Sequence, residues 1–155
     1  MTISTADLYD EHGEDLQSLS LQLHSFGATK SFNGPIRTVR CFEDNALLKS
    51  VLSRPGEGAV LVVDGGGSLE RAVMGDMIAK IAIENSWAGV IINGVVRDRA
   101  ILSELPLGVK ALGSNPRKST KEGTGETDIE VTIAGVTFRP GATVYADEDG
   151  ILVQR

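Results

Sequence analysis

In the first two thirds of the chain, apolar residues form two continuous runs that are typical of strands, and between these runs they recur at a spacing that is typical of a helix. Two continuous apolar runs, at residues 59–64 and 88–96, are typical of strands buried on both faces of a sheet. The apolar residues between these runs recur at the spacing of one helix face: Met74, Met77, Ile78, Ile81 and Ala82. This alternation predicts an α/β fold in which a helix joins two buried strands of a central sheet.

Weaker patterns predict the elements around this unit. Thr5 is the expected N-cap of a first helix, which is followed by leucines at mixed spacing as far as Leu23. Alternating apolar and polar residues predict a strand from Ile36, and Asp44 is the expected cap of a helix over residues 46–52. Two short elements are expected after the second buried strand, a helical turn at 100–102 and a strand at 109–112.

The last third of the sequence has the pattern of β-structure. Residues 119–127 predict a mobile loop. Residues 128–133 alternate in polarity, which is typical of a half-solvated strand, and Ala134-Gly135 turns this strand into the next one. Strands at 144–145 and 151–153, joined by an acidic turn, predict a terminal hairpin. We therefore expect a central β-sheet core followed by C-terminal β-hairpins.

Composition and charge exclude several classes of protein. A length of 155 residues without repeats or linkers predicts a single domain over residues 1–155. The formal net charge of -6 argues against a broad nucleic-acid surface, so no direct nucleic-acid contact is expected. The basic cluster at residues 117–121 is expected to be a solvated loop, with contact to RNA or to an acidic partner as the alternative. No apolar run is long enough to cross a membrane and no export signal begins the chain, which predicts a cytoplasmic protein.

Three charged residues stand where the central helix begins and where the strand after it ends. Asp76 lies in the segment Gly75–Ile78 at the helix start, and Arg97 and Asp98 follow the apolar run of residues 88–96. A helix followed by a strand of this length can return the chain to the same edge of a sheet. We therefore expect the three side chains to meet beside the free amides of the helix start.

Such a cluster suits an acid substrate and a divalent metal. The amides of Asp76, Met77 and Ile78 favour a carboxylate, and Arg97 can bind the same carboxylate through two parallel hydrogen bonds. Asp98 and Asp76 are hard oxygen donors of the kind that Mg²⁺ or Mn²⁺ prefers. A metal held there would chelate a small 2-oxo acid and polarise its keto group. This chemistry predicts retro-aldol cleavage or β-decarboxylation.

The same residues also have an ordinary structural explanation. A helix-capping Asp76 and a surface ion pair between Arg97 and Asp98 would account for them equally well. The spacing of one Asp, twenty residues and an Arg-Asp pair is by itself weak evidence for a site. The choice between the two explanations depends on the surrounding sequence.

Five longer segments, in order along nearly the whole chain, carry a more specific pattern. They are residues 42–48, 62–68, 87–98, 107–111 and 135–141. In these segments the chain resembles the RraA-like proteins, a family named for the regulator of ribonuclease E activity A that includes the 4-hydroxy-4-methyl-2-oxoglutarate aldolases. Family members with aldolase activity carry an Asp, then twenty residues, then Arg-Asp, and this sequence matches with Asp76, Arg97 and Asp98.

The resemblance implies a swivelling β/β/α-type fold, a ring-shaped homotrimer and active sites at the subunit boundaries. It also implies a role for each matched residue. Gly75 to Ile78 and Arg97 would bind the oxo acid, with Arg97 and Asp76 taking part in catalysis. Asp98 would bind the metal, and Asp76 would support its water shell.

The general acid/base is the one group that the resemblance leaves unassigned. Longer aldolases of the family have a C-terminal extension that supplies acidic residues to the neighbouring site, whereas this sequence stops at Arg155. Glu43 or Asp44, acting across an interface, is the remaining candidate.

Two functions follow as hypotheses. The first is a metal-dependent, class II aldolase that forms pyruvate from 4-hydroxy-4-methyl-2-oxoglutarate or a related 4-hydroxy-2-oxo acid and also decarboxylates oxaloacetate. The second is a non-catalytic trimeric protein that binds and inhibits a ribonuclease E-type enzyme. The physiological substrate, the metal used in the cell and the coexistence of the two roles stay open.

Overall fold

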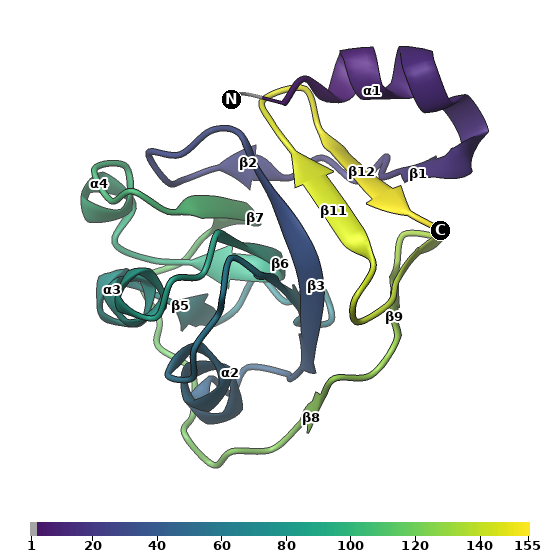
Figure 1. Ribbon diagram of the computed structural model, residues 1–155. Helices are drawn as coiled ribbons and strands as arrows, with labels where there is room; N and C mark the ends of the chain where they lie inside the picture. The colour runs from purple at the N-terminus through teal and green to yellow at the C-terminus, as the bar shows by residue number, and fades with distance from the viewer. Residues whose placement is uncertain (1–2) are drawn as a thin grey trace.

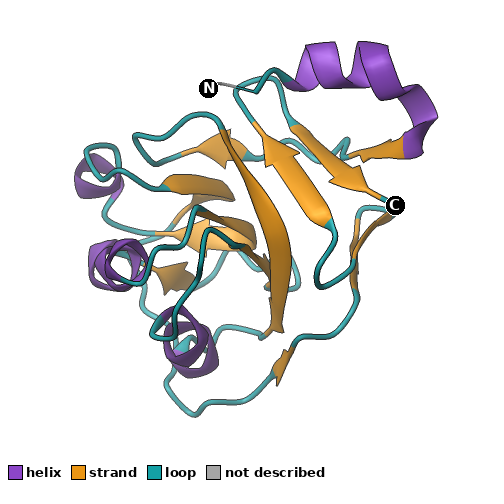
Figure 2. Cartoon of the chain, in the orientation of Figure 1, coloured by secondary structure: helices purple, strands orange, loops and turns teal. Residues whose placement is uncertain are grey.

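The computed structural model describes residues 3–155, which form a sheet-rich fold with few helices (Figures 1 and 2). The helices are α1 (Thr5–His12), the 3-10 helix η1 (Gly13–Asp15), α2 (Ala46–Leu52), α3 (Asp76–Glu84) and α4 (Arg99–Leu102). The strands of the first two thirds are β1 (Leu16–Ser18), β2 (His24–Ser25), β3 (Phe32–Arg40), β4 (Val60–Asp64), β5 (Ala72–Met74), β6 (Gly89–Val96) and β7 (Gly108–Ser114). The strands of the last third are β8 (Glu126–Thr127), β9 (Val131–Ile133), β10 (Val136–Phe138), β11 (Thr143–Ala146) and β12 (Ile151–Gln154).

Four parallel strands form the centre of the molecule. β3, β4, β6 and β7 lie side by side within a larger sheet of order β1-β12-β11-β3-β4-β6-β7-β2. Residues 60–63 of β4 are fully buried, as expected of a strand that is covered on both faces. The predicted α/β class with a large central sheet is confirmed, and so are the two C-terminal hairpins, β9–β10 and β11–β12.

Different elements cover the two faces of the parallel strands. Along β4, Leu61 and Val63 belong to the same hydrophobic cluster as α2 and α3, whereas Val60 and Val62 pack in a cluster with the C-terminal strands. This division follows from the two-residue period of a strand. Figure 1 shows α2, α3 and α4 on one side of the parallel strands, with β11, β12 and α1 on the other side. The layers therefore follow the expected β/β/α arrangement.

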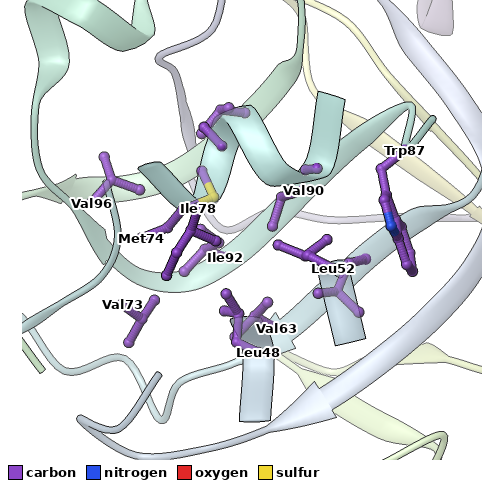
Figure 3. Close-up of a cluster of buried hydrophobic side chains, with 14 of the residues drawn as sticks. Leu48, Leu52, Val63, Val73, Met74, Ile78, Trp87, Val90, Ile92 and Val96 are labelled. Atoms are coloured by element: carbon purple, nitrogen blue, oxygen red, sulfur yellow. The ribbon is translucent and has the colours of Figure 1, made fainter. Parts of the chain in front are cut away.

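Aliphatic side chains hold α2 and α3 against the sheet (Figure 3). Leu48 and Leu52 of α2 and Ile78 of α3 gather with Val63 and Ile92 of the strands, and all five belong to one buried cluster. Complete burial of one such side chain stabilises the fold by about 1.5–3 kcal/mol. This cluster therefore holds both helices at the same edge of the sheet.

The helix predicted after β4 begins at Asp76, as expected, but Met74 does not lie on its apolar face. Met74 is instead the last residue of β5, a strand that the apolar pattern does not reveal. It pairs with Val96 of β6 and is 1% exposed. The prediction for Met74 is wrong because a three-residue strand carries too little periodicity to be separated from the helix that follows it.

The N-cap of the first helix lies one residue before the predicted cap, Thr5. Ser4 is the N-cap, and its Oγ accepts a hydrogen bond of 3.2 Å from the Asp7 amide. Thr5 is not the cap because its amide and hydroxyl both donate to the Asp147 carboxylate, at 2.7 and 2.6 Å. The helix ends at His12, and the leucines that follow belong partly to β1, which pairs with β12.

Two predicted strands have different bounds in the structure. The strand expected from Ile36 begins at Phe32, because its first residues pair with β11. The strand expected over residues 128–133 is confined to β9. Asp128 breaks it, since this residue has a φ of 53° and its carboxylate lies 2.8 Å from Arg37 Nε.

Asp44 has a wider role than the predicted helix cap. Its Oδ1 accepts a hydrogen bond of 3.2 Å from the Ala46 amide at the start of α2, although Asn45 is the N-cap residue by backbone position. The Asp44 side chain is nevertheless 1% exposed, so most of its hydrogen-bonding capacity is directed into the protein. A buried carboxylate of this kind requires several donors.

Those donors come from the loop over residues 119–127, which the sequence predicts to be mobile. Asp44 accepts hydrogen bonds from the Thr120 hydroxyl at 2.9 Å, the Glu122 amide at 2.7 Å and the Gly123 amide at 3.1 Å. The far end of the loop forms β8, which pairs with β3. We call the contact between Asp44 and residues 120–123 the loop latch.

Asp44→Asn is expected to lower the free energy of unfolding by about 2–3 kcal/mol at neutral pH, because two amides of the loop latch lose a charged acceptor. Urea denaturation of the two proteins would measure the difference. Asp10→Asn is a suitable control, because Asp10 is exposed on α1 and its substitution should hardly change the free energy of unfolding.

The difference in the free energy of unfolding between wild type and Asp44→Asn is expected to depend on pH. Burial raises the pKa of the Asp44 carboxyl, but four hydrogen bonds outweigh it and bring the pKa below its ordinary value; the donors are Glu122, Thr120, Gly123 and Ala46. The stability from this carboxylate is complete above the unfolded-state pKa of about 3.9 and is lost as the pH falls through the folded-state value. The difference in the free energy of unfolding between wild type and Asp44→Asn should therefore become smaller below about pH 4. If this difference in the free energy of unfolding stays constant through the same pH range, the Asp44 carboxylate does not stabilise the loop latch through its charge.

Candidate active site

All six residues that the sequence singles out line one cleft, which has a volume of about 420 Å³. They are Gly75, Asp76, Met77, Ile78, Arg97 and Asp98. The cleft lies where β6 ends and α3 begins, and the pairing of β5 with β6 brings these two points together. The carboxyl edge of parallel strands is the usual place for a ligand in such a sheet. The charged residues Asp76, Arg97 and Asp98 therefore lie together in this cleft, as the sequence predicts.

A hydrogen bond joins the two halves of this cluster. Asp98 Oδ2 accepts a hydrogen bond from the Asp76 amide at 3.0 Å, so the second residue after β6 is bonded to the first residue of α3. Asp98 adopts a left-handed backbone conformation with a φ of 62°. A Cβ atom at Gly75 would lie 2.5 Å from Asp98 Oδ2 and 3.2 Å from Arg97 Cγ. A side chain at position 75 would therefore displace the Asp98 carboxylate from the Asp76 amide.

The start of α3 provides backbone amides at the cleft. The first hydrogen bond of the helix runs from the Ala79 amide to the Gly75 carbonyl at 3.1 Å, so the amides of Asp76, Met77 and Ile78 precede the helical ladder. The Asp76 amide is bonded to Asp98, as described above. The partial positive charge at this helix end also favours an anion in the cleft.

The Asp76 carboxylate is held in its ionised form. It lies 3.4 Å from Lys80 Nζ, one turn along α3. Burial raises the pKa of the Asp76 carboxyl, but the hydrogen bond from Lys80 and the positive charge of its ammonium oppose this effect, and the pKa lies below its ordinary value. Asp76 therefore brings a negative charge to the cleft at neutral pH.

Arg97 keeps most of its donors available. Its amide donates to the Met74 carbonyl at 3.0 Å, which fixes the backbone, and its Nη1 donates to the Pro116 carbonyl at 3.3 Å. Its Nε lies 4.0 Å from Asp98 Oδ2, and 44% of the side chain is exposed. A guanidinium has five N–H donors in a fixed plane, so Arg97 can still bind a carboxylate in the cleft.

Asp98 and Asp76 are the two carboxylates of the cleft that could hold a metal ion. Within residues 3–155, no cluster of three or more His, Cys, Asp or Glu side chains is placed to hold an ion. Asp98 uses Oδ2 for the Asp76 amide, and none of the hydrogen bonds among the described residues reaches its Oδ1. One or two carboxylates completed by water and by substrate oxygens are a common arrangement for Mg²⁺. The residues present therefore fit a hydrated Mg²⁺ or Mn²⁺ ion.

The two acid/base candidates, Glu43 and Asp44, have other contacts in this chain. Asp44 forms the loop latch. Glu43 Oε2 accepts a hydrogen bond of 2.6 Å from the Ser68 hydroxyl, and Glu43 Oε1 lies 3.7 Å from Arg71 Nε. The lining of the cleft includes neither of them.

Six polar residues of the cleft are not evident from the sequence. They are Asn45, Lys49, Ser50, Ser53, Lys118 and Lys121. The basic cluster at 117–121 is visible in the sequence, but a solvated loop is the expectation for it. The structure places two of its lysines in the cleft because the loop latch and β5 hold this segment beside α3.

The described part of the chain has no helix that is long and apolar enough to cross a membrane.

Comparisons with known proteins give a consistent picture. Residues 5–153 match the model of the family described as RraA-like, Aldolase/RraA. A protein described as S-adenosylmethionine: 2-dimethylmenaquinone methyltransferase, from Geobacillus kaustophilus HTA426, has a structure with a TM-score of 0.96 and 47% identity, covering 98% of this chain and 94% of that one.

Two further structures carry RraA names. The RNA-processing inhibitor RraA from Thermus thermophilis is 46% identical, with a TM-score of 0.94 over 99% of this chain and 93% of that one. Streptomyces coelicolor RraAS2, described as an unusual member of the RNase ES inhibitor RraA protein family, is 27% identical, with a TM-score of 0.79 over 97% of this chain and 80% of that one.

Replacing Lys80 with Met is expected to raise the pKa of the Asp76 carboxyl, because the neighbouring ammonium is one cause of its low value. NMR titration of the side-chain carboxyl carbons would measure this pKa. Lys49→Met is the matched control, since Lys49 lines the same cleft from α2 but makes no ion pair with Asp76. Equal effects of the two substitutions would show that Lys80 has no specific influence on this carboxylate.

Proposed function

Because the chain belongs to the RraA-like family, we propose that it is a divalent-metal-dependent lyase that forms pyruvate from a small 2-oxo acid. The substrate class is 4-hydroxy-4-methyl-2-oxoglutarate and related 4-hydroxy-2-oxo acids, with decarboxylation of oxaloacetate as a second activity. The observation that carries the proposal is the convergence of Asp76, Arg97 and Asp98 in one cleft.

The chain's own residues can orient a 2-oxo acid. Arg97 binds the substrate carboxylate through its free N–H donors, next to the amides of Met77 and Ile78 at the start of α3. Asp98 would hold the divalent metal, and Asp76 would accept hydrogen bonds from water molecules bound to that metal. Bound Mg²⁺ or Mn²⁺ supplies a Lewis acid for the keto oxygen.

Cleavage requires the electrons of one carbon–carbon bond to be accepted. In the aldol substrate the bond between C3 and C4 breaks, the C4 hydroxyl loses its proton, and C4 becomes a carbonyl. The electron pair stays on the C3 side and delocalises toward the keto oxygen, where Arg97 stabilises the developing negative charge. Protonation of C3 then gives pyruvate. In oxaloacetate the same bond breaks and the departing fragment is CO₂.

We propose a homotrimer in which a neighbouring subunit completes the cleft and supplies the acid/base group. Two large apolar side chains support this assembly. Met77, at the cleft, is 72% exposed, and Phe42 is 62% exposed. Exposed apolar side chains of this size are typical of surfaces that another chain covers.

The second candidate function is binding and inhibition of a ribonuclease E-type enzyme. It is supported by the 46% identity with the RNA-processing inhibitor from Thermus thermophilis. The net charge of -6 is compatible with a basic segment on such a partner. This role would not need the metal site.

The purified protein is expected to release pyruvate from oxaloacetate when Mg²⁺ or Mn²⁺ is added, and to stop when EDTA removes the metal. Pyruvate formation coupled to lactate dehydrogenase would measure the rate. Asp98→Asn should abolish the metal-stimulated rate. Arg97→Lys should lower kcat/KM by about 10–100-fold, because an ammonium cannot form two parallel hydrogen bonds with a carboxylate.

Arg139→Lys is the control for this series. Arg139 pairs with Glu130 at 3.7 Å and does not line the cleft. The Arg139→Lys variant should therefore form pyruvate at the wild-type rate. Metal-stimulated turnover that survives Asp98→Asn would refute the assigned metal ligand. A wild-type protein without any metal-stimulated turnover would refute the lyase.

If the protein also acts as a ribonuclease regulator, it should be retained by an immobilised ribonuclease E-type enzyme and should slow that enzyme's cleavage of RNA. Retention should weaken at raised salt if charge drives it. Asp98→Asn and Arg97→Lys should bind as wild type does, because this role does not use the cleft. Absence of both retention and inhibition at micromolar concentrations would exclude the regulator.

A further inference from the structure

Arg97 lies between two hollows of the surface. It lines the cleft described above, and together with Asp98 it also lines a second cavity of about 380 Å³ at the end of β7 and the start of α4. The other residues of this second cavity are Arg99, Ser114, Asn115 and Pro116. The guanidinium therefore has space on both sides, and polar contacts set the direction in which it points.

One backbone carbonyl holds the guanidinium. Arg97 Nη1 donates to the Pro116 carbonyl at 3.3 Å, and the guanidinium has no other hydrogen bond within residues 3–155. Its Nε lies 4.0 Å from Asp98 Oδ2, which is a long distance for an ion pair. An arginine binds a carboxylate through two donors in one plane, so the direction of this plane decides whether both hydrogen bonds can form. The Pro116 carbonyl is therefore the contact that orients Arg97.

Asn115 fixes the backbone on both sides of this carbonyl. Its amide donates to the Val96 carbonyl at 3.0 Å, which ties it to the end of β6, directly before Arg97. Its Oδ1 accepts a hydrogen bond of 3.0 Å from the Arg117 amide, and so bridges across Pro116. Such a bond from a side chain to the backbone two residues on is typical of Asn in turns. Pro116 adds a fixed φ angle to the same turn.

The nitrogen of the Asn115 carboxamide ties this turn to the segment before β5. Nδ2 donates to the Leu69 carbonyl at 2.8 Å and to the Glu70 carbonyl at 3.2 Å. This segment leads into β5, which pairs with β6. Asn115 therefore uses both ends of its carboxamide. Neither a carboxylate, which has no donor, nor an aliphatic side chain can make the same set of contacts.

We propose that Asn115 is a positioning residue for Arg97: it fixes the Pro116 carbonyl and thereby directs the guanidinium toward a carboxylate in the cleft. Asn115 does not line the cleft, so it acts through Arg97 and not on the ligand. The inference rests on the proposed lyase function for the identity of the ligand, a 2-oxo acid. The orientation of Arg97 by Asn115 can be measured without that ligand.

The first test observes the Arg97 side chain in the free protein. Rotation about the Nε–Cζ bond of an arginine exchanges its two Nη groups, and a hydrogen bond to one of them slows this exchange. NMR of ¹⁵N-labelled protein would measure the rate, with the Arg97 signals assigned by their loss in Arg97→Lys. We expect Asn115→Ala to raise the rate at least about threefold, within the range for the loss of one hydrogen bond. An unchanged rate overturns the proposal.

Two controls establish that the effect is local. Arg37 binds the Asp128 carboxylate at 2.8 and 3.1 Å, and its rotation rate should stay the same in Asn115→Ala. Asn85→Ala is the matched substitution, because it also removes a hydrogen bond from an Asn to a carbonyl, that of Ile81 at 2.9 Å, but at the other end of α3. An equal increase of the Arg97 rate in Asn85→Ala would overturn the specific role of Asn115. Thermal unfolding verifies that each variant is folded.

The second test asks whether Asn115 acts on ligand binding through Arg97. Calorimetry with Mg²⁺ present would measure the affinity for 2-oxobutyrate, an unreactive 2-oxo acid. Asn115→Ala should weaken binding at least about threefold when residue 97 is arginine, and less than about 1.5-fold in the Arg97→Lys background. The reason is that the three donors of an ammonium rotate and need no fixed plane. The same factor in both backgrounds would overturn the positioning role.

The two measurements separate the positioning role from the lyase. If Asn115→Ala frees the Arg97 side chain in a protein that neither binds nor turns over a 2-oxo acid, the orienting contact is supported and the lyase is refuted. If wild type turns over oxaloacetate while Asn115→Ala changes neither the Arg97 rotation nor the affinity for 2-oxobutyrate, the lyase stands and the positioning role is refuted.

Discussion

The hydrogen bond between the Asp98 carboxylate and the Asp76 amide is the contact on which the cleft depends. It fixes the end of β6 to the start of α3, two points separated by 22 residues of sequence. The bond requires a glycine at position 75, because a side chain there would strike Asp98, and it requires the left-handed backbone of Asp98. The charge of the carboxylate also complements the positive end of the helix. One interaction thus sets the positions of Asp76, Arg97 and Asp98 together.

The sequence predicts this part of the molecule well because its signals are local and strong. The apolar run of β4 and the helical spacing after it give the order of elements, and the return of a parallel strand to the same sheet edge brings Arg97 and Asp98 to Asp76. Strand β5 escapes this kind of prediction. It has three residues, and its pairing with β6 decides its conformation rather than its own pattern.

The lysines that line the cleft cannot be predicted from the sequence, for a different reason. Lys118 and Lys121 lie in a glycine-containing polar loop, whose composition is typical of a solvated segment. Their placement depends on Asp44, whose partners lie 76 to 79 residues further along the chain. A single carboxylate in the sequence does not identify its distant donors, since hydrogen bonds to backbone amides leave no mark on residue type. The predicted helix cap at Asp44 captures the smaller of its two roles.

The loop latch holds the segment from Thr120 to Gly123 mainly through backbone amides, and the anchoring of Lys118 likewise uses its carbonyl. The lysine side chains are therefore not needed to keep the loop in place. Substitutions at positions 118 and 121 should therefore cost little folding stability, whereas a side chain at position 75 would displace the Asp98 carboxylate from the Asp76 amide. The two walls of the cleft thus differ in how strongly their side chains are tied to the fold.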